Sequence, residues 1–440
     1  MTYEDALAFI DSLLVHARPP LAAETDKLRR VEQLLHRLGD PHRRLPTVLI
    51  AGTKGKGSTA AMLASIMQVS GLRVGLYSKP HLVEYRERIR VNGELIAPDA
   101  LARVVKIVQP HVEAMAHDPL GVPTYFEVSV ALAFLHFALS EVQLAVVEVG
   151  LGGRLDATNV ADPLVSVVTP VSYDHMDVLG TTLEAITREK AGIIRPRGVV
   201  VSAPQVPEAL AVIIEACARH HARLHLVDEV MRWQPLTSSL HEQTFTLSGP
   251  WRDYGQLTLP LVGAHQLVNA ATAVATAEAL APLGFPPTAN AVAAGLAAVR
   301  WPARVEVVHE HPYVVLDVAH NPASIAALRQ TLEAMFPGRR IILVFAMVAT
   351  HDHRATTSLI APLADVVIVT TPQHVKPLPA VALAETVRQY ARTVEIVEDR
   401  FAAVERALSL AQPDDVVVVA GSFFLVGDVR ERLTRSTQSA

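Results

Sequence analysis

The chain has 440 residues, of which 50% are hydrophobic and 19% charged, with a formal net charge of −5 and one cysteine. This composition excludes a disordered chain, and the negative charge argues against a general nucleic-acid surface. No apolar run approaches the roughly 18 to 20 residues that span a bilayer, and one cysteine permits no internal disulfide. The start, MTYEDALAF, lacks a basic segment followed by an apolar one, so we expect no secretory signal and a cytoplasmic protein.

The first 300 residues alternate helical and strand-like segments. Residues 20–42 carry a repeating apolar face and predict a helix that ends at Gly39. Continuous apolar runs follow at 47–52, 73–78, 144–150, 164–171 and 198–204, with helical patterns at 128–141 and 182–194 among them. Such runs are typical of strands buried on both faces of a parallel sheet, so the pattern predicts a doubly wound α/β fold.

The pattern changes after residue 240. Residues 241–261 alternate polar and apolar side chains and predict an antiparallel hairpin, which the helical segment 265–284 follows. Beyond VRWPARVE (299–306) a second α/β alternation begins. We therefore predict one α/β domain over residues 1–298, built on a mostly parallel sheet. A smaller Rossmann-like α/β domain over residues 299–440 is predicted to follow it.

Residues 51–58, AGTKGKGS, join the strand-like run TVLI to a helix expected from Ser58 to about Val69. Backbone N–H groups of a glycine-rich turn converge on an anion, and the helix N-terminus adds partial positive charge. Lys56 can reach a phosphate oxygen, and Ser58 can cap the helix or contact Mg²⁺. The loop departs from G-x-x-x-x-G-K-[ST], and a flexible turn is the alternative interpretation. The flanking strand, the helix and the Lys-Gly-Ser run favour phosphate binding.

Other candidate residues are ambiguous when each is considered alone. Glu148 ends a predicted strand, where it could bind a metal ion or cap a helix. His175 is as well explained by loop hydrogen bonds, and Lys190 by a solvated position on a helix. The sequence Asp317-x-x-His320-Asn321 is compatible with a turn and a helix cap.

An ordered set of motifs removes much of this ambiguity. The loop GTKGKGST resembles the variant phosphate loop of the Mur ligase superfamily, and specifically that of the folylpolyglutamate synthase/dihydrofolate synthase family. The further matching stretches are HLVEYRERIRVNGE (81–94), TYFEVSVALAF (124–134), EVGLGGRLDATN (148–159), DHMDVLG (174–180), REKAGIIR (188–195), HQLVNAATA (265–273), WPARVEVV (301–308) and DVAHNP (317–322). The resemblance covers essentially the whole chain.

The resemblance implies an ATP-dependent amide ligase, in which residues 1–298 form a P-loop-type, ATP-binding Mur-ligase central domain and residues 299–440 form the C-terminal glutamate-ligase domain. This ligase would add L-glutamate to a reduced folate, to dihydropteroate or to both through an acyl phosphate, with Mg²⁺ and ATP bound to a monomer. The implied nucleotide contacts are Lys54, Gly55, Lys56, Gly57, Ser58, Asn269, Arg304 and Asp317. The implied metal ligands are Ser78, Glu148 and His175, and the implied catalytic residues are Lys56, Lys190 and His320. Lys190 matches a family lysine that is carbamylated, and the segment 80–90 is where we expect the pterin.

Two departures from the family pattern keep alternatives open. Relatives usually have T-S-P-H where this chain has Ser78-Lys79-Pro80-His81, and an ammonium cannot ligate a metal ion. Lys79 could neutralise phosphate in place of a cation, Ser78 could substitute as the ligand, or activity could be lost. The stretch AMVATHDH (346–353) also replaces a more charged one. A Mur-type ligase for another carboxylate and an ATP-binding homologue without ligase activity therefore remain the alternatives.

Overall fold

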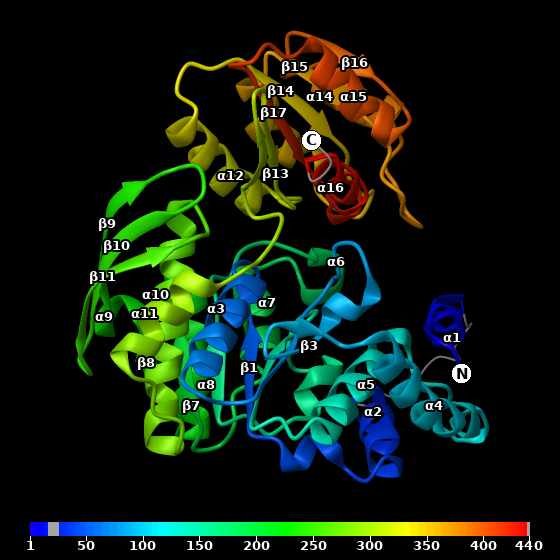
Figure 1. The fold of residues 1–440 in the computed structure, drawn as a ribbon. Coiled ribbons are helices and arrows are strands. Elements are labelled where there is room, and N and C mark those ends of the chain that lie inside the picture. The colour runs from blue at the N-terminus through cyan, green and yellow to red at the C-terminus, as the bar shows by residue number, and fades with distance from the viewer. Residues whose placement is uncertain (16–25, 438–440) are drawn as a thin grey trace. The chain divides into compact units, whose positions relative to one another are not determined.

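The computed structural model describes residues 1–15 and 26–437. Within them the chain forms two compact units, drawn in Figure 1. The first unit contains Met1–Trp233, Leu247–Leu257 and Val268–Val299, and the second contains Gln234–Thr246, Thr258–Leu267 and the chain from Arg300 onward. No helix among the described residues is both long and apolar enough to cross a membrane. The functional division at residues 298 and 299 stays a prediction.

An eight-stranded, mostly parallel sheet forms the centre of the first unit, in the order β4-β3-β2-β5-β1-β6-β7-β8. Its strands are β1 (Thr47–Ala51), β2 (Val74–Tyr77), β3 (Ile89–Val91), β4 (Glu94–Leu95), β5 (Leu144–Glu148), β6 (Val165–Val168), β7 (Val199–Ser202) and β8 (Arg223–Leu226). Only β3 and β4 pair antiparallel to their neighbours. Ile50 of β1 lies opposite Glu148 of β5 and Val167 of β6, so the carboxyl ends of these three strands lie side by side.

Helices cover this sheet because its strands are apolar on both faces. Those of the first unit are α1 (Tyr3–Val15), α2 (Asp26–Arg37), α3 (Lys56–Val69), α4 (Pro98–Ala114), α5 (Tyr125–Leu139), α6 (Met176–Leu179), α7 (Leu183–Ala191), α8 (Pro207–His220), α9 (Val227–Val230) and α11 (Ala289–Ala298), with α10 (Ala264–Leu280) extending into both units. Leu49 and Ala51 pack into one core with α1, α2, α4 and α5. Because successive strand side chains alternate, Val48 and Ile50, also fully buried, point to the opposite face.

A buried ion pair joins two of these helices. The Arg30 guanidinium of α2 donates two hydrogen bonds to the Glu127 carboxylate of α5, at 2.8 and 2.9 Å. Glu127 also accepts from the Thr124 N–H and so completes the capping box that begins α5. Every polar atom of the pair thus has a partner, as burial of two charges requires.

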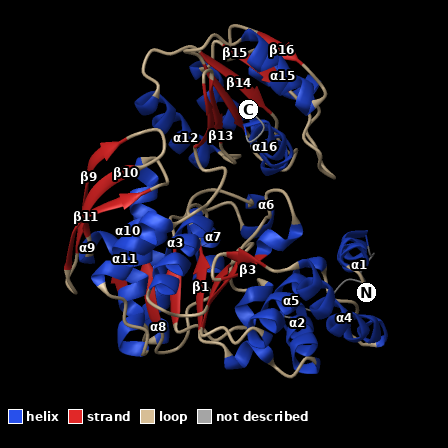
Figure 2. Ribbon diagram, viewed as in Figure 1, coloured by secondary structure: helices blue, strands red, loops and turns tan. Residues whose placement is uncertain are grey.

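The second unit has its own six-stranded sheet, in the order β12-β13-β17-β14-β15-β16. The strands are β12 (Glu306–Glu310), β13 (Tyr313–Leu316), β14 (Ile341–Phe345), β15 (Val366–Val369), β16 (Val394–Ile396) and β17 (Val416–Ala420). All neighbours are parallel except β12 and β13. The associated helices are α12 (Pro322–Met335), α13 (His353–Ile360), α14 (Ala380–Val387), α15 (Arg400–Leu410) and α16 (Phe423–Thr437). Figure 2 shows the strands of each sheet with helices packed around them.

The predicted fold class is confirmed: a large, parallel-rich α/β sheet precedes a smaller one. Details differ. The phosphate-loop helix begins at Lys56, two residues before the predicted start, because Gly55 adopts a left-handed conformation and ends the loop there. The hairpin strands β10 (Gln243–Ser248) and β11 (Asp253–Leu259) are joined by a third, β9 (Arg232–Ser238). Residues 20–25 of the predicted first amphipathic helix lie outside the described part of the chain.

The contact between α3 and α11 generates a stability prediction. A Cβ at Gly295 would lie 2.5 Å from the Ile66 Cα and 2.8 Å from its N. Alanine normally stabilises a helix interior by about 1 kcal/mol relative to glycine, but a backbone clash cannot relax by rotamer change. We expect Gly295→Ala to destabilise the protein by about 2 kcal/mol, in line with overpacked cores. Urea unfolding measures this, with Ala294→Ser on the exposed face of α11 as a near-neutral control. A stabilised Gly295→Ala variant would contradict the tight packing.

Candidate active site

The glycine-rich loop is held at the carboxyl end of β1 by backbone contacts. The N–H groups of Thr53 and Lys54 both donate to the Pro170 carbonyl, at 3.0 and 3.1 Å. These donors are therefore occupied. The N–H groups of Lys56, Gly57 and Ser58 lie in the first turn of α3, where helix geometry provides no intrahelical acceptor. An anion would be received by this first turn.

Two glycines of the loop have no room for a side chain. A Cβ at Gly52 would lie 2.0 Å from the Thr169 Oγ1, and one at Gly55 would lie 2.1 Å from the Asn269 Oδ1. Both glycines also have positive φ angles, 144° and 79°. The loop therefore fits between the segment after β6 and the α10 residue Asn269, which the sequence motif had placed with the nucleotide. Ser58 is buried within the first turn of α3 and does not cap it, since Gly55 occupies the N-cap position.

Three lysine side chains gather at this loop. The Lys56 Nζ donates to the carbonyls of Gly52 and Thr53 at 3.1 and 3.4 Å, and the Lys190 Nζ donates to the same Gly52 carbonyl at 3.0 Å. The Lys54 Nζ lies 3.5 Å from the Asp174 carboxylate. Three amines and one carboxylate make the site electropositive, which suits a polyanion.

Burial changes the acidity of two of these amines. Burial, with a smaller contribution from the neighbouring Lys56 ammonium, lowers the pKa of Lys190 to about 7, while Asp174 opposes the shift. Burial likewise lowers the pKa of Lys54 to about 8, against the attraction of Asp174. The solvated position that its helical context suggested for Lys190 is wrong, because Lys190 is buried at the end of α7. Near neutral pH a large fraction of its amine is uncharged.

The predicted metal ligands lie on three different segments. Glu148 is the buried last residue of β5, and its Oε2 accepts from the Lys79 N–H at 3.3 Å. Ser78 follows β2 and is buried, with its N–H donating to the Arg88 carbonyl. His175 has a half-exposed side chain and a left-handed backbone, and its N–H donates to the Asp174 Oδ1.

These groups fit a magnesium ion through Glu148. No three His, Cys, Asp or Glu side chains gather as a ready metal cluster in residues 1–15 and 26–437. Magnesium usually keeps several waters and binds through one or two carboxylates plus substrate phosphates, so a single well-placed carboxylate beside a phosphate loop suffices. Glu148 lies opposite Ile50 in the register of β5 and β1, next to the strand from which the loop departs.

In the second unit the residues Arg304, Asp317 and His320 surround one turn. The buried Asp317 carboxylate accepts from the N–H groups of Val305 and Ala319, at 2.9 and 2.7 Å. Burial raises the pKa of Asp317, and the Arg304 guanidinium opposes this. Ala303 and Val305, on either side of Arg304, both have positive φ. Asp317 therefore holds the strained turn that carries Arg304.

The His320 side chain faces aromatic neighbours. Its Nδ1 lies 2.8 Å from the Val318 carbonyl, and its ring lies 4.9 Å from that of His351 and 5.4 Å from that of Phe423. Phe423 also lies under the Arg304 guanidinium. Sequence reasoning had flagged the segment 346–353 as unusual without connecting it to His320. Its Asp352 accepts from the Ala355 N–H and caps α13.

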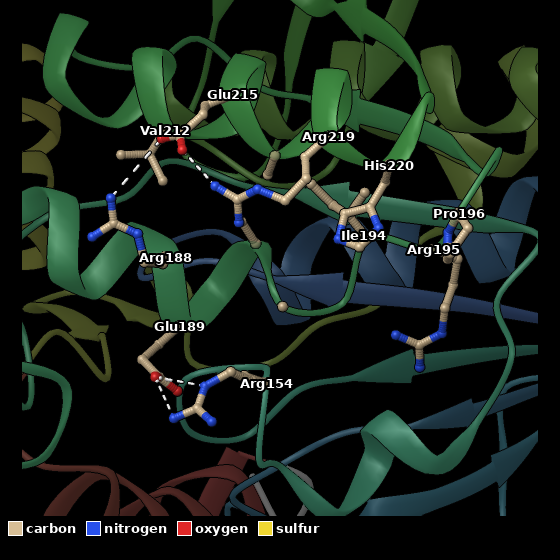
Figure 3. A pocket seen from close by; sticks show the side chains of 13 residues that line it. Arg154, Arg188, Glu189, Ile194, Arg195, Pro196, Val212, Glu215, Arg219 and His220 are labelled. Atoms are coloured by element: carbon tan, nitrogen blue, oxygen red, sulfur yellow. Dashed lines mark hydrogen bonds and ion pairs between the residues drawn. The ribbon is translucent and has the colours of Figure 1, made fainter.

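A cavity of about 670 Å³ lies between α7 and α8, and no phosphate-loop residue lines it. Figure 3 shows the ion pairs among its lining residues: Arg154 with Glu189, and Arg188 and Arg219 each with Glu215. The Arg154 N–H also donates to the Glu189 carbonyl, the residue before Lys190. The two contacts of Arg154 with Glu189 fix the last turn of α7, which carries Lys190 to the loop.

Fold and site together define a Mur ligase. Residues 50–277 match the Mur ligase middle domain, and residues 303–423 match the glutamate ligase domain of Mur ligases. The chain belongs to the dihydrofolate synthase/folylpolyglutamate synthase family. It is 33% identical to a Bacillus subtilis protein of that name over 98% of this chain and 99% of the relative. It is 35% identical to a Lacticaseibacillus casei folylpolyglutamate synthase, covering 98% and 99%.

A solved structure shows the same similarity. Mycobacterium tuberculosis folylpolyglutamate synthase, complexed with ADP, superposes with a TM-score of 0.88 at 33% identity, over 98% of this chain and 99% of the other. The predicted family and the predicted class of enzyme, a ligase, are thereby confirmed. The roles of individual residues stay predictions.

Lys190 provides a pH-dependent test of this geometry. Its pKa of about 7 lies below the ordinary value of 10.5, so keeping it protonated in the folded state costs stability. This cost is full below about pH 7 and vanishes as the pH rises toward 10.5. We expect Lys190→Met to raise the free energy of unfolding by on the order of 1–3 kcal/mol at pH 6.5, and by progressively less at pH 8 and 9.5.

Urea unfolding in CO₂-depleted buffer measures the difference between variant and wild type at each pH. Arg188→Met is the control on the same helix, because Arg188 is exposed and makes only a long ion pair with Glu215. If Lys190→Met raised the free energy of unfolding by the same amount at every pH, this result would contradict the shifted pKa of Lys190.

Proposed function

We propose that this protein uses ATP to join L-glutamate to the carboxylate of a folate-type acceptor, either a reduced folate or dihydropteroate. One observation carries the proposal: three lysine side chains surround a glycine-rich loop beside the strand-end carboxylate Glu148. A site of this composition suits a nucleotide triphosphate and a second anion. The relatives named above act on folates, which supports the acceptor class.

The reaction needs charge neutralisation more than covalent chemistry. An oxygen of the acceptor carboxylate attacks the γ-phosphorus, the bond to the β,γ-bridging oxygen breaks, and ADP leaves. The glutamate amine then attacks the acyl carbon and expels inorganic phosphate, with loss of a proton. Repulsion between the carboxylate and the triphosphate must be overcome before the first step, so positioned cations provide most of the rate enhancement.

The residues of the first unit divide this work. The first turn of α3, from Lys56 to Ser58, receives the phosphates with Gly55 as its N-cap, and the Lys54 and Lys56 ammonium groups add positive charge. Asn269, in contact range of Gly55, orders the same loop and is proposed to contact the nucleotide. Glu148, Ser78 and His175 are the groups proposed to hold magnesium, which when bound would neutralise phosphate charge.

Lys190 is proposed to react with CO₂ to form a carbamate. In that reaction the neutral amine attacks the carbon of CO₂ and releases one proton, converting a cation into an oxygen ligand. Only an unprotonated amine can do this, and burial lowers the pKa of Lys190 to about 7, so enough neutral amine exists at physiological pH. The proposal thus has a physical basis beyond the family motif.

The second unit is proposed to supply Arg304 and Asp317 for the nucleotide and His320 for the incoming amino acid. A guanidinium suits charge that develops on the γ-phosphate. The acceptor is proposed to lie along residues 80–90, where the Arg88 guanidinium faces the rings of Tyr85 and Tyr125 at 5.7 and 5.3 Å. We further propose that the protein is a cytoplasmic monomer.

The deciding experiment measures ADP release with ATP, L-glutamate and one acceptor at a time. We expect release with dihydropteroate, tetrahydrofolate or both, and a product whose mass has increased by one glutamyl residue. Release only with a cell-wall nucleotide precursor would instead identify a different Mur-type substrate. ATP binding without ADP release for every carboxylate would show that ligase activity has been lost.

Arg304 gives a residue-level prediction. We expect Arg304→Ala to lower kcat by roughly 10²-fold or more, the usual effect of removing one donor that stabilises transition-state charge. The KM for the folate acceptor should change less. Arg406→Ala, which removes an exposed ion pair with Glu395 in the same unit, is the control. Unchanged turnover in a folded Arg304→Ala variant would refute the role of Arg304.

A further inference from the structure

Lys79 lies among the acidic groups at the carboxyl ends of β2 and β5. Its backbone N–H donates to the Glu148 Oε2 at 3.3 Å, and its Nζ lies 3.6 Å from the Asp156 Oδ2. The ammonium also lies 4.6 Å from the centre of the Phe126 ring, a cation–π distance. Only 15% of the Lys79 side chain is exposed. The charge therefore has a defined position inside the proposed site.

The loop after β5 is shaped to receive this ammonium. A Cβ at Gly150 would lie 1.4 Å from both the Nζ and the Cε of Lys79, so the end of the lysine side chain packs directly against the Gly150 backbone. Asp156 is held in place by hydrogen bonds from the N–H groups of Gly150 and Leu151 and from the Thr158 hydroxyl. A flexible surface lysine would have none of these features.

From this geometry we propose that the Lys79 ammonium is a built-in cation that replaces one divalent metal ion next to Glu148. The inference rests on the function proposed above. An ammonium only donates hydrogen bonds and cannot ligate a metal ion, and its charge repels a second cation at short range. Lys79 would thus neutralise negative charge permanently at the edge of the phosphate site, and the nucleotide complex would contain one Mg²⁺, bound through Glu148.

A purely structural ion pair between Lys79 and Asp156 is the competing explanation. It predicts lower stability when Lys79 is replaced but no change in metal content. The two explanations therefore differ in a quantity that does not depend on turnover, which is the number of metal ions bound per nucleotide.

The experiment titrates Mn²⁺ into the protein with a saturating non-hydrolysable ATP analogue and follows free Mn²⁺ by electron paramagnetic resonance. We expect one Mn²⁺ per bound nucleotide in the wild type. In Lys79→Ser, which removes the charge and supplies a hydroxyl ligand, we expect two. Lys79→Met removes the charge without adding a ligand and should keep one Mn²⁺ while binding the nucleotide less tightly.

Phe126→Leu serves as the matched control, since it removes the aromatic contact and keeps the ammonium, and it should keep one Mn²⁺. Two Mn²⁺ per nucleotide in the wild type, or equal numbers in wild type and folded Lys79→Ser, would overturn the proposal. A wild-type count of two would overturn the proposal even if the serine variant does not fold.

The same titration separates this inference from the proposed function. Absence of nucleotide binding would refute the proposed function itself. Nucleotide binding and acceptor-dependent ADP release, together with an unchanged Mn²⁺ count in Lys79→Ser, would refute only the replacement of a metal ion by Lys79.

Discussion

The first unit is organised around the carbonyl of Gly52, which accepts hydrogen bonds from two lysine amines at once. Lys56 comes from the helix that follows the loop. Lys190 comes from the end of α7 and lies 138 residues after Gly52 in the sequence. Two like charges at one acceptor would repel each other, and burial makes the repulsion stronger. Burial and the neighbouring Lys56 ammonium together lower the pKa of Lys190 to about 7, which reduces the repulsion between the two amines.

The position of that carbonyl follows from the sheet. β1 lies between β5 and β6, and parallel strands bring their carboxyl ends to a common edge. The glycine loop, Glu148 and the segment of Asp174 and His175 leave that edge from three adjacent strands. The loop at this edge requires glycine at two positions, because Gly52 and Gly55 have positive φ angles and no space for a Cβ.

Charge is distributed unevenly around this edge. On the side of β6 and α7, lysines predominate and Asp174 is the carboxylate that opposes them. On the side of β2 and β5, Asp156 lies next to the ammonium of Lys79, and Glu148 accepts a hydrogen bond from the Lys79 backbone N–H. Lys79, which departs from the family motif, therefore places its positive charge next to a carboxylate. This position supports the proposal that the Lys79 ammonium replaces the charge of a metal ion, rather than a loss of the site.

The sequence by itself determined the family, the order of strands and helices, and the types of residue at the site, because motif spacing and hydrophobic periodicity are local properties of the chain. It correctly predicted β1, β2 and β5 to β7 from continuous apolar runs, but not β3, β4, β8, β9 or β12, whose side chains are mostly exposed or only partly buried. Tertiary structure alone decided the burial and pKa of Lys190, the contact of Asn269 with Gly55, and the place of Lys79 between Gly150 and Asp156. These depend on long-range contacts that bring distant segments together, and desolvation and electrostatics act only after those contacts form.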